Sequence, residues 1–122
     1  MMSKALAIFM ILCSISTGVW ADVAAEIDHL LGFIGGSPCR FVRNGDEYDA
    51  PAARAHIERK YDYAKRWIQT AEQFIEYTAI KSSTTGVPYR VICAGSEEPS
   101  ADWLMRELAR FRAGSGGGDG DG

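Results

Sequence analysis

The chain has 122 residues, of which 47% are hydrophobic and 24% are charged, and its formal net charge is −3. This length supports one hydrophobic core and leaves no room for a second domain of ordinary size. A mildly acidic chain has no electrostatic basis for binding nucleic acid or anionic lipid, so we expect neither kind of partner.

The first 21 residues have the organisation of a secretory signal peptide. Lys4 supplies a positive charge, Ala5 to Ile15 form an apolar stretch, and Val19-Trp20-Ala21 offers residues suited to a cleavage site. A membrane-spanning helix needs about 20 apolar residues, and serine, threonine and glycine interrupt this stretch earlier. We therefore expect cleavage near Ala21, a periplasmic location, and no stable membrane insertion after cleavage.

The remaining chain divides into a single monomeric domain over residues 22–113 and a tail over residues 114–122. The tail contains only glycine, serine and aspartate. Such residues cannot bury apolar surface, so the composition predicts a disordered tail.

Cys39 and Cys93 are the two cysteines of the predicted mature chain. An exported protein folds in an oxidising compartment, where two cysteines in a small domain are expected to pair. Their disulfide would close a loop of about 55 residues and stabilise the fold by roughly 4 kcal/mol on the chain-entropy estimate. Neither a Cys-x-x-Cys pair nor a suitably placed histidine suggests a catalytic thiol.

The first predicted helix begins with Asp22 as its N-cap and ends at Gly35-Gly36. Its apolar residues recur at helical spacing, at Ile27, Leu30, Leu31 and Ile34. Residues 39–43 and 46–48 flank an Asn44-Gly45 turn, which predicts a short β-hairpin. Cys39 and Phe41 would share one face of it.

A long amphipathic segment follows, from about Pro51 to Ala79. Asp49 and Pro51 form a strong helix start. Thr70-Ala71-Glu72-Gln73 fits a capping box, so the segment is either one helix or two helices with a break near Gln69. The pattern alone does not distinguish these alternatives.

The end of the chain predicts a loop over residues 82–86, a strand over 88–93 and a last helix that starts at Pro99-Ser100. The apolar face of this helix comprises Trp103, Leu104, Leu108 and Phe111. The predicted fold is therefore α+β: a small single domain with helices packed on a short antiparallel sheet, formed by the hairpin and one further strand. The sequence shows no internal repeat.

Four motifs, taken in order, resemble the YfeK-like family of small exported bacterial proteins. They are Phe41-Val42-Arg43-Asn44-Gly45, the segment from Ala55 to Lys60, the segment from Thr70 to Ile75, and the segment from Ser82 to Tyr89. The resemblance spans about residues 27–111. It implies a periplasmic protein of Gram-negative bacteria whose activity is not established, and it transfers no catalytic residue.

The polar residues of these motifs are the candidates for a binding site. His56, Lys60, Tyr63 and Trp67 recur every three or four residues along one helix flank. We expect part of this flank to converge with the hairpin and the later loop on one groove for a peptide, glycan or anionic ligand. The candidate residues are Arg43, Asn44, His56, Lys60, Trp67, Ser82, Ser83 and Tyr89.

Two other interpretations of these residues remain open. In a structural interpretation, Asn44 serves only the turn, Trp67 belongs to the core, and Ser82 and Ser83 cap backbone groups. In a hydrolase interpretation, Ser82 or Ser83 is the nucleophile and His56 the base, with Glu58 or Glu72 orienting the histidine. The chain lacks the usual motifs of serine enzymes, and His29 and His56 lack zinc-ligand spacing, so neither a metal nor a cofactor is expected.

We therefore expect a non-enzymatic interaction module of the cell envelope, whose partner is another envelope protein or a wall-derived ligand. An inhibitor or immunity-type protein is the alternative, by analogy of size and disulfide. Its binding determinants would lie on a projecting loop, such as residues 43–46 or 82–86.

Overall fold

A computed structural model describes residues 18–120 of the chain. Its helices are α1 (Gly18–Gly35), α2 (Ala50–Ala64), the 3-10 turn η1 (Lys65–Trp67), α3 (Ala71–Thr78) and α4 (Ser100–Gly120). Its strands are β1 (Arg40–Arg43), β2 (Asp46–Tyr48), β3 (Arg90–Cys93) and β4 (Ser96–Pro99). The predicted leader lies for the most part outside the described residues.

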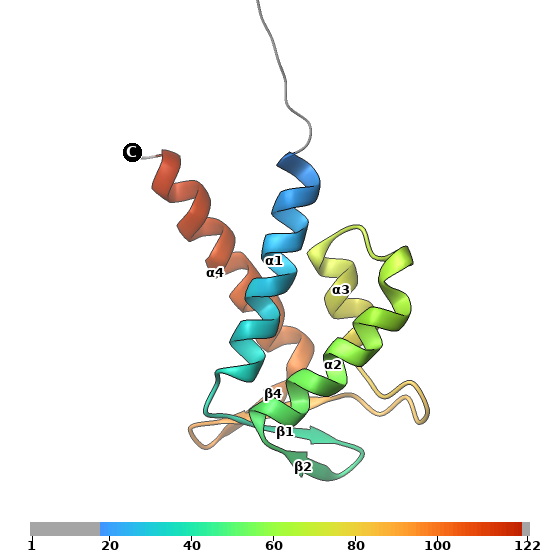
Figure 1. Ribbon diagram of the computed structural model, residues 1–122. Helices are drawn as coiled ribbons and strands as arrows, with labels where there is room; N and C mark the ends of the chain where they lie inside the picture. The colour runs from blue at the N-terminus through green and yellow to red at the C-terminus, as the bar shows by residue number, and fades with distance from the viewer. Residues whose placement is uncertain (1–17, 121–122) are drawn as a thin grey trace, which may run out of the picture.

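The four strands form one antiparallel sheet in the order β2-β1-β3-β4, and the helices cover one of its faces (Figure 1). Phe41 and Val91 face this helical layer and are buried. On the opposite face, Arg40 pairs with Glu47, and Arg90 pairs with Glu97. The expected α+β class, with helices on an antiparallel sheet, is confirmed.

The core lies between the sheet and the helices. The predicted apolar residues of α1 are buried there, together with Phe74 and Ile75 of α3 and Trp103, Leu104 and Leu108 of α4. Glu107 of α4 is buried to 5% exposure, and its carboxylate contacts His29 at 2.6 Å and Arg110 at 2.6 and 2.8 Å. These contacts meet the requirement that a buried charge be paired.

Helix α1 begins earlier than predicted. Asp22 was expected to be its N-cap, but the helix starts at Gly18 and Asp22 lies inside it. An N-cap residue has a non-helical backbone, and the preceding Val-Trp-Ala residues simply continue the helix. At the other end, a Cβ atom at Gly35 would lie 2.8 Å from the Arg54 side chain of α2, so that flexible side chain would have to move.

The long segment from Pro51 to Ala79 forms two helices with a break, which resolves the alternative that the sequence left open. The Asp49 side chain accepts a hydrogen bond from the Ala52 amide at the start of α2, and the Thr70 hydroxyl accepts one from the Gln73 amide at the start of α3. Gln73 accepts a bond from the Gln69 amide at 2.6 Å. Local capping therefore fixes the break where the capping-box motif indicated it.

The sheet contains a strand that the sequence analysis missed. Only one strand was predicted over residues 88–93, but β3 turns back at Ala94-Gly95 into β4. Ala94 has a positive φ of 51°, close to the 52° of Asn44 in the predicted hairpin. Alanine rarely adopts this conformation, and β4 contains residues of low β propensity, so no local signal marked this second hairpin.

The two hairpins and the helices after them form a structural repeat at a constant offset of fifty positions. Phe41 pairs with its counterpart Val91 at the centre of the β1–β3 ladder, and the registers of the two hairpins also correspond. The sequence showed no repeat because few counterparts are identical: Arg40 and Arg90, Gly45 and Gly95, and Glu47 and Glu97. The sheet thus has a pseudo-twofold axis.

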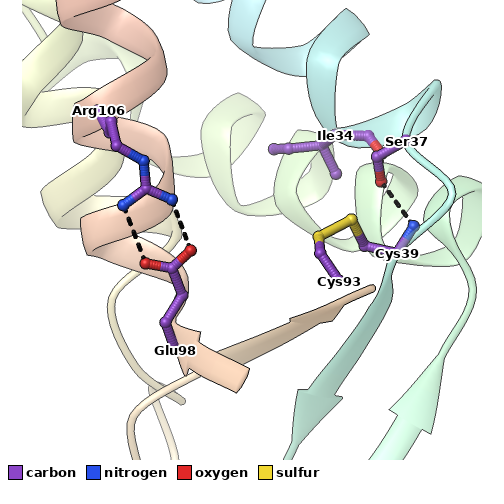
Figure 2. Close-up of a disulfide and its surroundings, with 6 residues drawn as sticks. All are labelled: Ile34, Ser37, Cys39, Cys93, Glu98 and Arg106. Atoms are coloured by element: carbon purple, nitrogen blue, oxygen red, sulfur yellow. Dashed lines mark hydrogen bonds and ion pairs between the residues drawn. A yellow bond between two sulfur atoms is a disulfide. The ribbon is translucent and has the colours of Figure 1, made fainter. Parts of the chain in front are cut away.

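The predicted disulfide between Cys39 and Cys93 is confirmed, with the two Cα atoms 4.6 Å apart. It joins the chain just before β1 to the end of β3, next to Ile34 at the end of α1 (Figure 2). The Cys39 amide donates to the Ser37 hydroxyl at 3.4 Å, and that hydroxyl donates to the Ile34 carbonyl at 3.1 Å. One end of the central ladder is therefore covalently closed.

Helix α4 continues to Gly120, although the composition predicts disorder from residue 114. Once a helix is formed, each further residue adds a hydrogen bond at low cost, but each glycine weakens the helix by about 1 kcal/mol relative to alanine. This extension has no apolar residue with which to join the core. In the part of the chain that the structure describes, no helix combines the length and apolarity needed to cross a membrane.

Candidate functional site

A cavity of about 270 Å³ lies between α2, the sheet and the start of α4. Its inner wall is apolar and buried, and it includes Ile34, Phe41, Ile57, Ala79, Trp103 and Leu104. Its polar lining comes from Arg43, Tyr48, His56, Arg59, Tyr89 and Ser100. Pockets of this kind, apolar with a few convergent polar groups, are typical of small-molecule sites.

Tyr89 stands at the centre of the polar lining, although only 6% of it is exposed. Its backbone amide donates to the Ile80 carbonyl, and its carbonyl accepts from the Ser100 amide, both at 2.9 Å. These bonds fix the residue between the end of α3 and the start of α4. Its hydroxyl is thereby held toward α2, where it lies 3.1 Å from both His56 Nε2 and Lys60 Nζ.

The three side chains form a directed hydrogen-bond chain. The Lys60 ammonium can only donate, and it donates to the Tyr89 hydroxyl and to the Lys81 carbonyl, each at 3.1 Å. The Tyr89 hydroxyl then donates its own proton to Nε2 of a neutral His56, an assignment made from the network. His56 therefore carries its remaining proton on Nδ1.

Burial and neighbouring positive charges set the protonation of this chain. Burial first, then the charges of Arg43, Lys60 and Arg59, lower the pKa of His56 from 6.5 to about 4. Burial and Arg43 also lower the pKa of Lys60, and burial raises the pKa of Tyr89 against the opposing effect of Arg43. At neutral pH, His56 is thus a neutral hydrogen-bond donor among cations.

Among the described residues, the cations around the cavity lack carboxylate partners, as do Arg66 and Lys81, which do not line it. Most arginines of the described chain contact a carboxylate, as in the pairs of Arg54 with Glu58 and Arg112 with Glu26 and Glu72. Arg43, Arg59 and Lys60 form no ion pair with any described residue. The Arg43 guanidinium contacts only an uncharged group, the Tyr48 hydroxyl at 3.3 Å. A local excess of positive charge therefore borders the cavity of an acidic protein.

Asn44 and Ser82 are brought together, but as a structural connection. The Asn44 amide donates to the Ser82 hydroxyl at 3.3 Å, and the Thr85 hydroxyl donates to the Asn44 carbonyl oxygen at 2.6 Å. Ser82, only 3% exposed, also contacts the Thr84 hydroxyl at 3.0 Å. These bonds attach the loop over residues 82–86 to the turn of the first hairpin, beside the cavity.

The remaining predicted site residues lie elsewhere. Trp67 in η1 is 54% exposed and stands under the guanidinium of Arg66, so it belongs to neither the cavity nor the core. Tyr63, from the same predicted flank, is 85% exposed. Ser83 is exposed in the loop and does not line the cavity. The break after α2 explains the position of Trp67, because a continuous helical flank exists only as far as Ala64. Tyr63 lies within α2, beyond Arg59, the last residue of this helix that lines the cavity.

The structure does not assemble the serine-hydrolase arrangement. His56 bonds to Tyr89, while the Ser82 hydroxyl is engaged by Asn44 and Thr84. Neither acid proposed to orient the histidine does so, because Glu58 contacts Arg54 and Glu72 contacts Arg112. Within the described residues, no group of three or more histidine, cysteine, aspartate or glutamate side chains is placed to hold a metal ion.

Sequence reasoning missed Arg59 and Tyr48 as parts of the polar lining and Trp103 as part of the apolar wall. Arg59 has oppositely charged neighbours in the sequence, a pattern typical of a solvated helix face. It follows His56 by three positions, a spacing that places both on one side of α2. This spacing was therefore the sequence signal that could have placed Arg59 beside His56 in the polar lining.

Comparison with known proteins gives one family match and one similar relative. The sequence pattern described as "Family of unknown function (DUF5329)" matches residues 21–112. A stretch of 49 residues is 47% identical to "Uncharacterized protein YfeK" of Salmonella typhimurium, and it covers 40% of this chain and 41% of that relative. No solved structure matches. These matches confirm the YfeK-like resemblance, and neither description assigns an activity.

Proposed function

The chain belongs to the DUF5329 family of unknown function, and from its cavity we propose that it is a non-enzymatic binding module of the cell envelope. Its ligand is a small molecule, or a small apolar group of a larger one, that occupies the cavity between α2 and the sheet. The observation that carries this proposal is the combination of a buried apolar wall with a polar lining fixed in place.

The way in which Tyr89 is held supports binding rather than catalysis. Both of its backbone groups are bonded, and its hydroxyl is shared between Lys60 and His56. A lining that is already organised loses little conformational freedom when a ligand enters, which favours affinity. The arrangement lacks a nucleophile in contact with a base, which nucleophilic catalysis requires.

An inhibitor-type function receives less support. Residues 83–86 of the loop are exposed, but Asn44 attaches the loop to the first hairpin through Ser82 and Thr85. The apolar space next to it is the more specific feature, because apolar wall and polar groups converge there. We therefore place the binding determinants in the cavity.

The test is to fill the cavity. Ala53 lines it and is partly buried, so Ala53→Leu should occupy the space, whereas Ala109→Leu adds the same atoms at an exposed position of α4. We expect the oxidised protein to bind 1-octanol or octanoate, with NMR shift changes at the Ala79 amide and the Trp103 indole. Ala53→Leu should abolish these changes and Ala109→Leu should not. If neither compound shifts these signals in the native protein, the proposal is wrong.

The envelope location is a separate part of the proposal, supported by the leader-like segment of residues 1–21 and the disulfide. Expression in a Gram-negative host followed by osmotic-shock fractionation should release a protein that begins at Asp22. A full-length product in the cytoplasm would contradict it.

A further inference from the structure

We propose that the cavity selects a single-chain amphiphile with an anionic headgroup, such as a medium-chain carboxylate. This inference rests on the proposed function and adds the chemical class of the ligand. It arises from one juxtaposition: arginines without carboxylate partners border a cavity whose inner wall is apolar and buried.

The size of the cavity limits the apolar part of the ligand. A volume of about 270 Å³ equals the liquid volume of about nine water molecules, so it can hold a chain of about eight carbon atoms. The wall formed by Ile34, Phe41, Ile57 and Leu104 offers such a chain no hydrogen-bonding group. An alkyl chain fits this surface better than a sugar or a polar peptide segment.

The charges on the polar side determine the sign of the headgroup. Arg43 and Arg59 line the cavity, and Lys60 lies close enough to His56 to lower its pKa together with them. No acidic residue of the described chain lines the cavity. These positive side chains repel one another. A cationic headgroup bound here would add to that repulsion, whereas an anionic headgroup would reduce it.

The donors at this point are also suited to a carboxylate. The Arg43 guanidinium has donors beyond the one directed to the Tyr48 hydroxyl. The His56 network directs the Nδ1 proton away from Tyr89, and no hydrogen bond is formed by Nδ1 within residues 22–114. An arginine with a neutral donor beside it can bind a carboxylate by charge-assisted hydrogen bonds.

The experiment compares three probes of equal chain length: octanoate, 1-octanol and octylammonium. We expect octanoate to bind about tenfold or more tightly than 1-octanol, which corresponds to one charge-assisted interaction. Octylammonium should bind more weakly than 1-octanol. Added salt should weaken octanoate binding and leave 1-octanol binding unchanged, because only the former depends on charge.

Variants that remove one positive charge at a time provide the matched comparison. Arg43→Gln and Arg59→Gln should each weaken octanoate binding several-fold, and should weaken it more than they weaken the binding of 1-octanol. Arg66→Gln is the control, since Arg66 is an exposed cation of η1 that does not line the cavity. It removes the same charge and should leave both affinities unchanged.

The outcomes separate the two proposals. If neither octanol nor octanoate shifts the Ala79 and Trp103 signals, the cavity is not a binding site and both proposals fail. If octanol binds and octanoate binds no more tightly, the cavity is a site for apolar groups and the charge selection alone is wrong. Equal losses in Arg43→Gln and Arg66→Gln would also contradict the selection.

Discussion

The two hairpin-helix units, residues 40–64 and 90–114, occupy equivalent positions but are used differently. In the second unit, Arg106 of α4 bonds bidentately to Glu98 at 2.6 and 3.0 Å (Figure 2). The counterparts in the first unit are His56 and Tyr48, which are not joined to each other, and the cavity lies between their elements. An ion pair thus joins the helix of the second unit to its hairpin, whereas in the first unit a cavity lies between the helix and the hairpin.

The central ladder shows the same contrast at its two ends. The pseudo-twofold axis relates Cys39 to Tyr89 and Cys93 to Arg43, so the disulfide at one end corresponds to a tyrosine and an arginine at the other. The covalent end stabilises the fold, and the polar end lines the cavity. One end of the ladder is thus fixed covalently, while the other end borders the cavity.

Of the changes that test this contrast between the two ends of the ladder, removing the disulfide should have the largest effect on stability. We expect Cys39→Ala/Cys93→Ala to lower the free energy of unfolding by about 2–5 kcal/mol, because the bond closes a loop with a sequence separation of 54 residues. Urea denaturation of the oxidised protein measures the difference. The reduced native protein should resemble the double variant, and a loss below about 1 kcal/mol would show that the ladder does not depend on this end.

Tyr89→Phe tests the polar end of the central ladder, opposite the disulfide, by removing one hydroxyl. His56 and Lys60 would each lose a hydrogen-bond partner in a half-buried site, so we expect a loss of about 1–2 kcal/mol in the free energy of unfolding. Tyr77→Phe is the control, because Tyr77 is 48% exposed on α3. If both variants denature at the same urea concentration, the hydroxyl makes no contribution to stability.

The pH dependence of stability should distinguish the two units. The pKa of His56 is lowered from 6.5 to about 4 in the folded state, so the unfolded chain binds more protons between these values. The contribution of neutral His56 is therefore present above pH 6.5 and is lost as the pH falls toward 4. Because His56 is only partly buried, we expect about 1 kcal/mol rather than the full value of the shift.

His56→Gln should remove this part of the pH dependence, since glutamine does not titrate. Urea denaturation at several pH values between 4 and 7 measures it, and an NMR titration of His56 gives its pKa directly. A native His56 that titrates near 6.5 would contradict the electrostatic description of the site. In the second unit, the pKa of Glu98 is held below its usual value by hydrogen bonds from Arg106, so any loss there begins only at lower pH.

Sequence reasoning predicted the elements with strong local signals. The Asn44-Gly45 hairpin, the Asp49 cap and the disulfide follow from residue types that favour one conformation or one chemistry. The second hairpin did not follow, because tertiary pairing places Ala94 in a conformation that its local preference disfavours.

The candidate site was predicted in part for a related reason. Arg43, His56, Lys60 and Tyr89 converge as expected from the motifs that contain them. Trp67 does not, because the helical spacing that linked it to His56 ends where α2 ends. The cavity itself depends on residues from α1, α3 and α4, and a one-dimensional pattern contains no information about the space between them.

The smallest expected effect concerns the two turns, where the same substitution should act with opposite sign. Ala94 and Asn44 have nearly equal positive φ angles, but only Asn44 uses its side chain, in bonds to Ser82 and Thr85. Ala94→Gly should therefore stabilise the fold by about 0.5–1 kcal/mol, because glycine relieves the strain. Asn44→Gly should destabilise it by a similar amount. Thermal unfolding of both variants measures the difference, and a shift in the same direction would mean that the loop over residues 82–86 does not depend on Asn44.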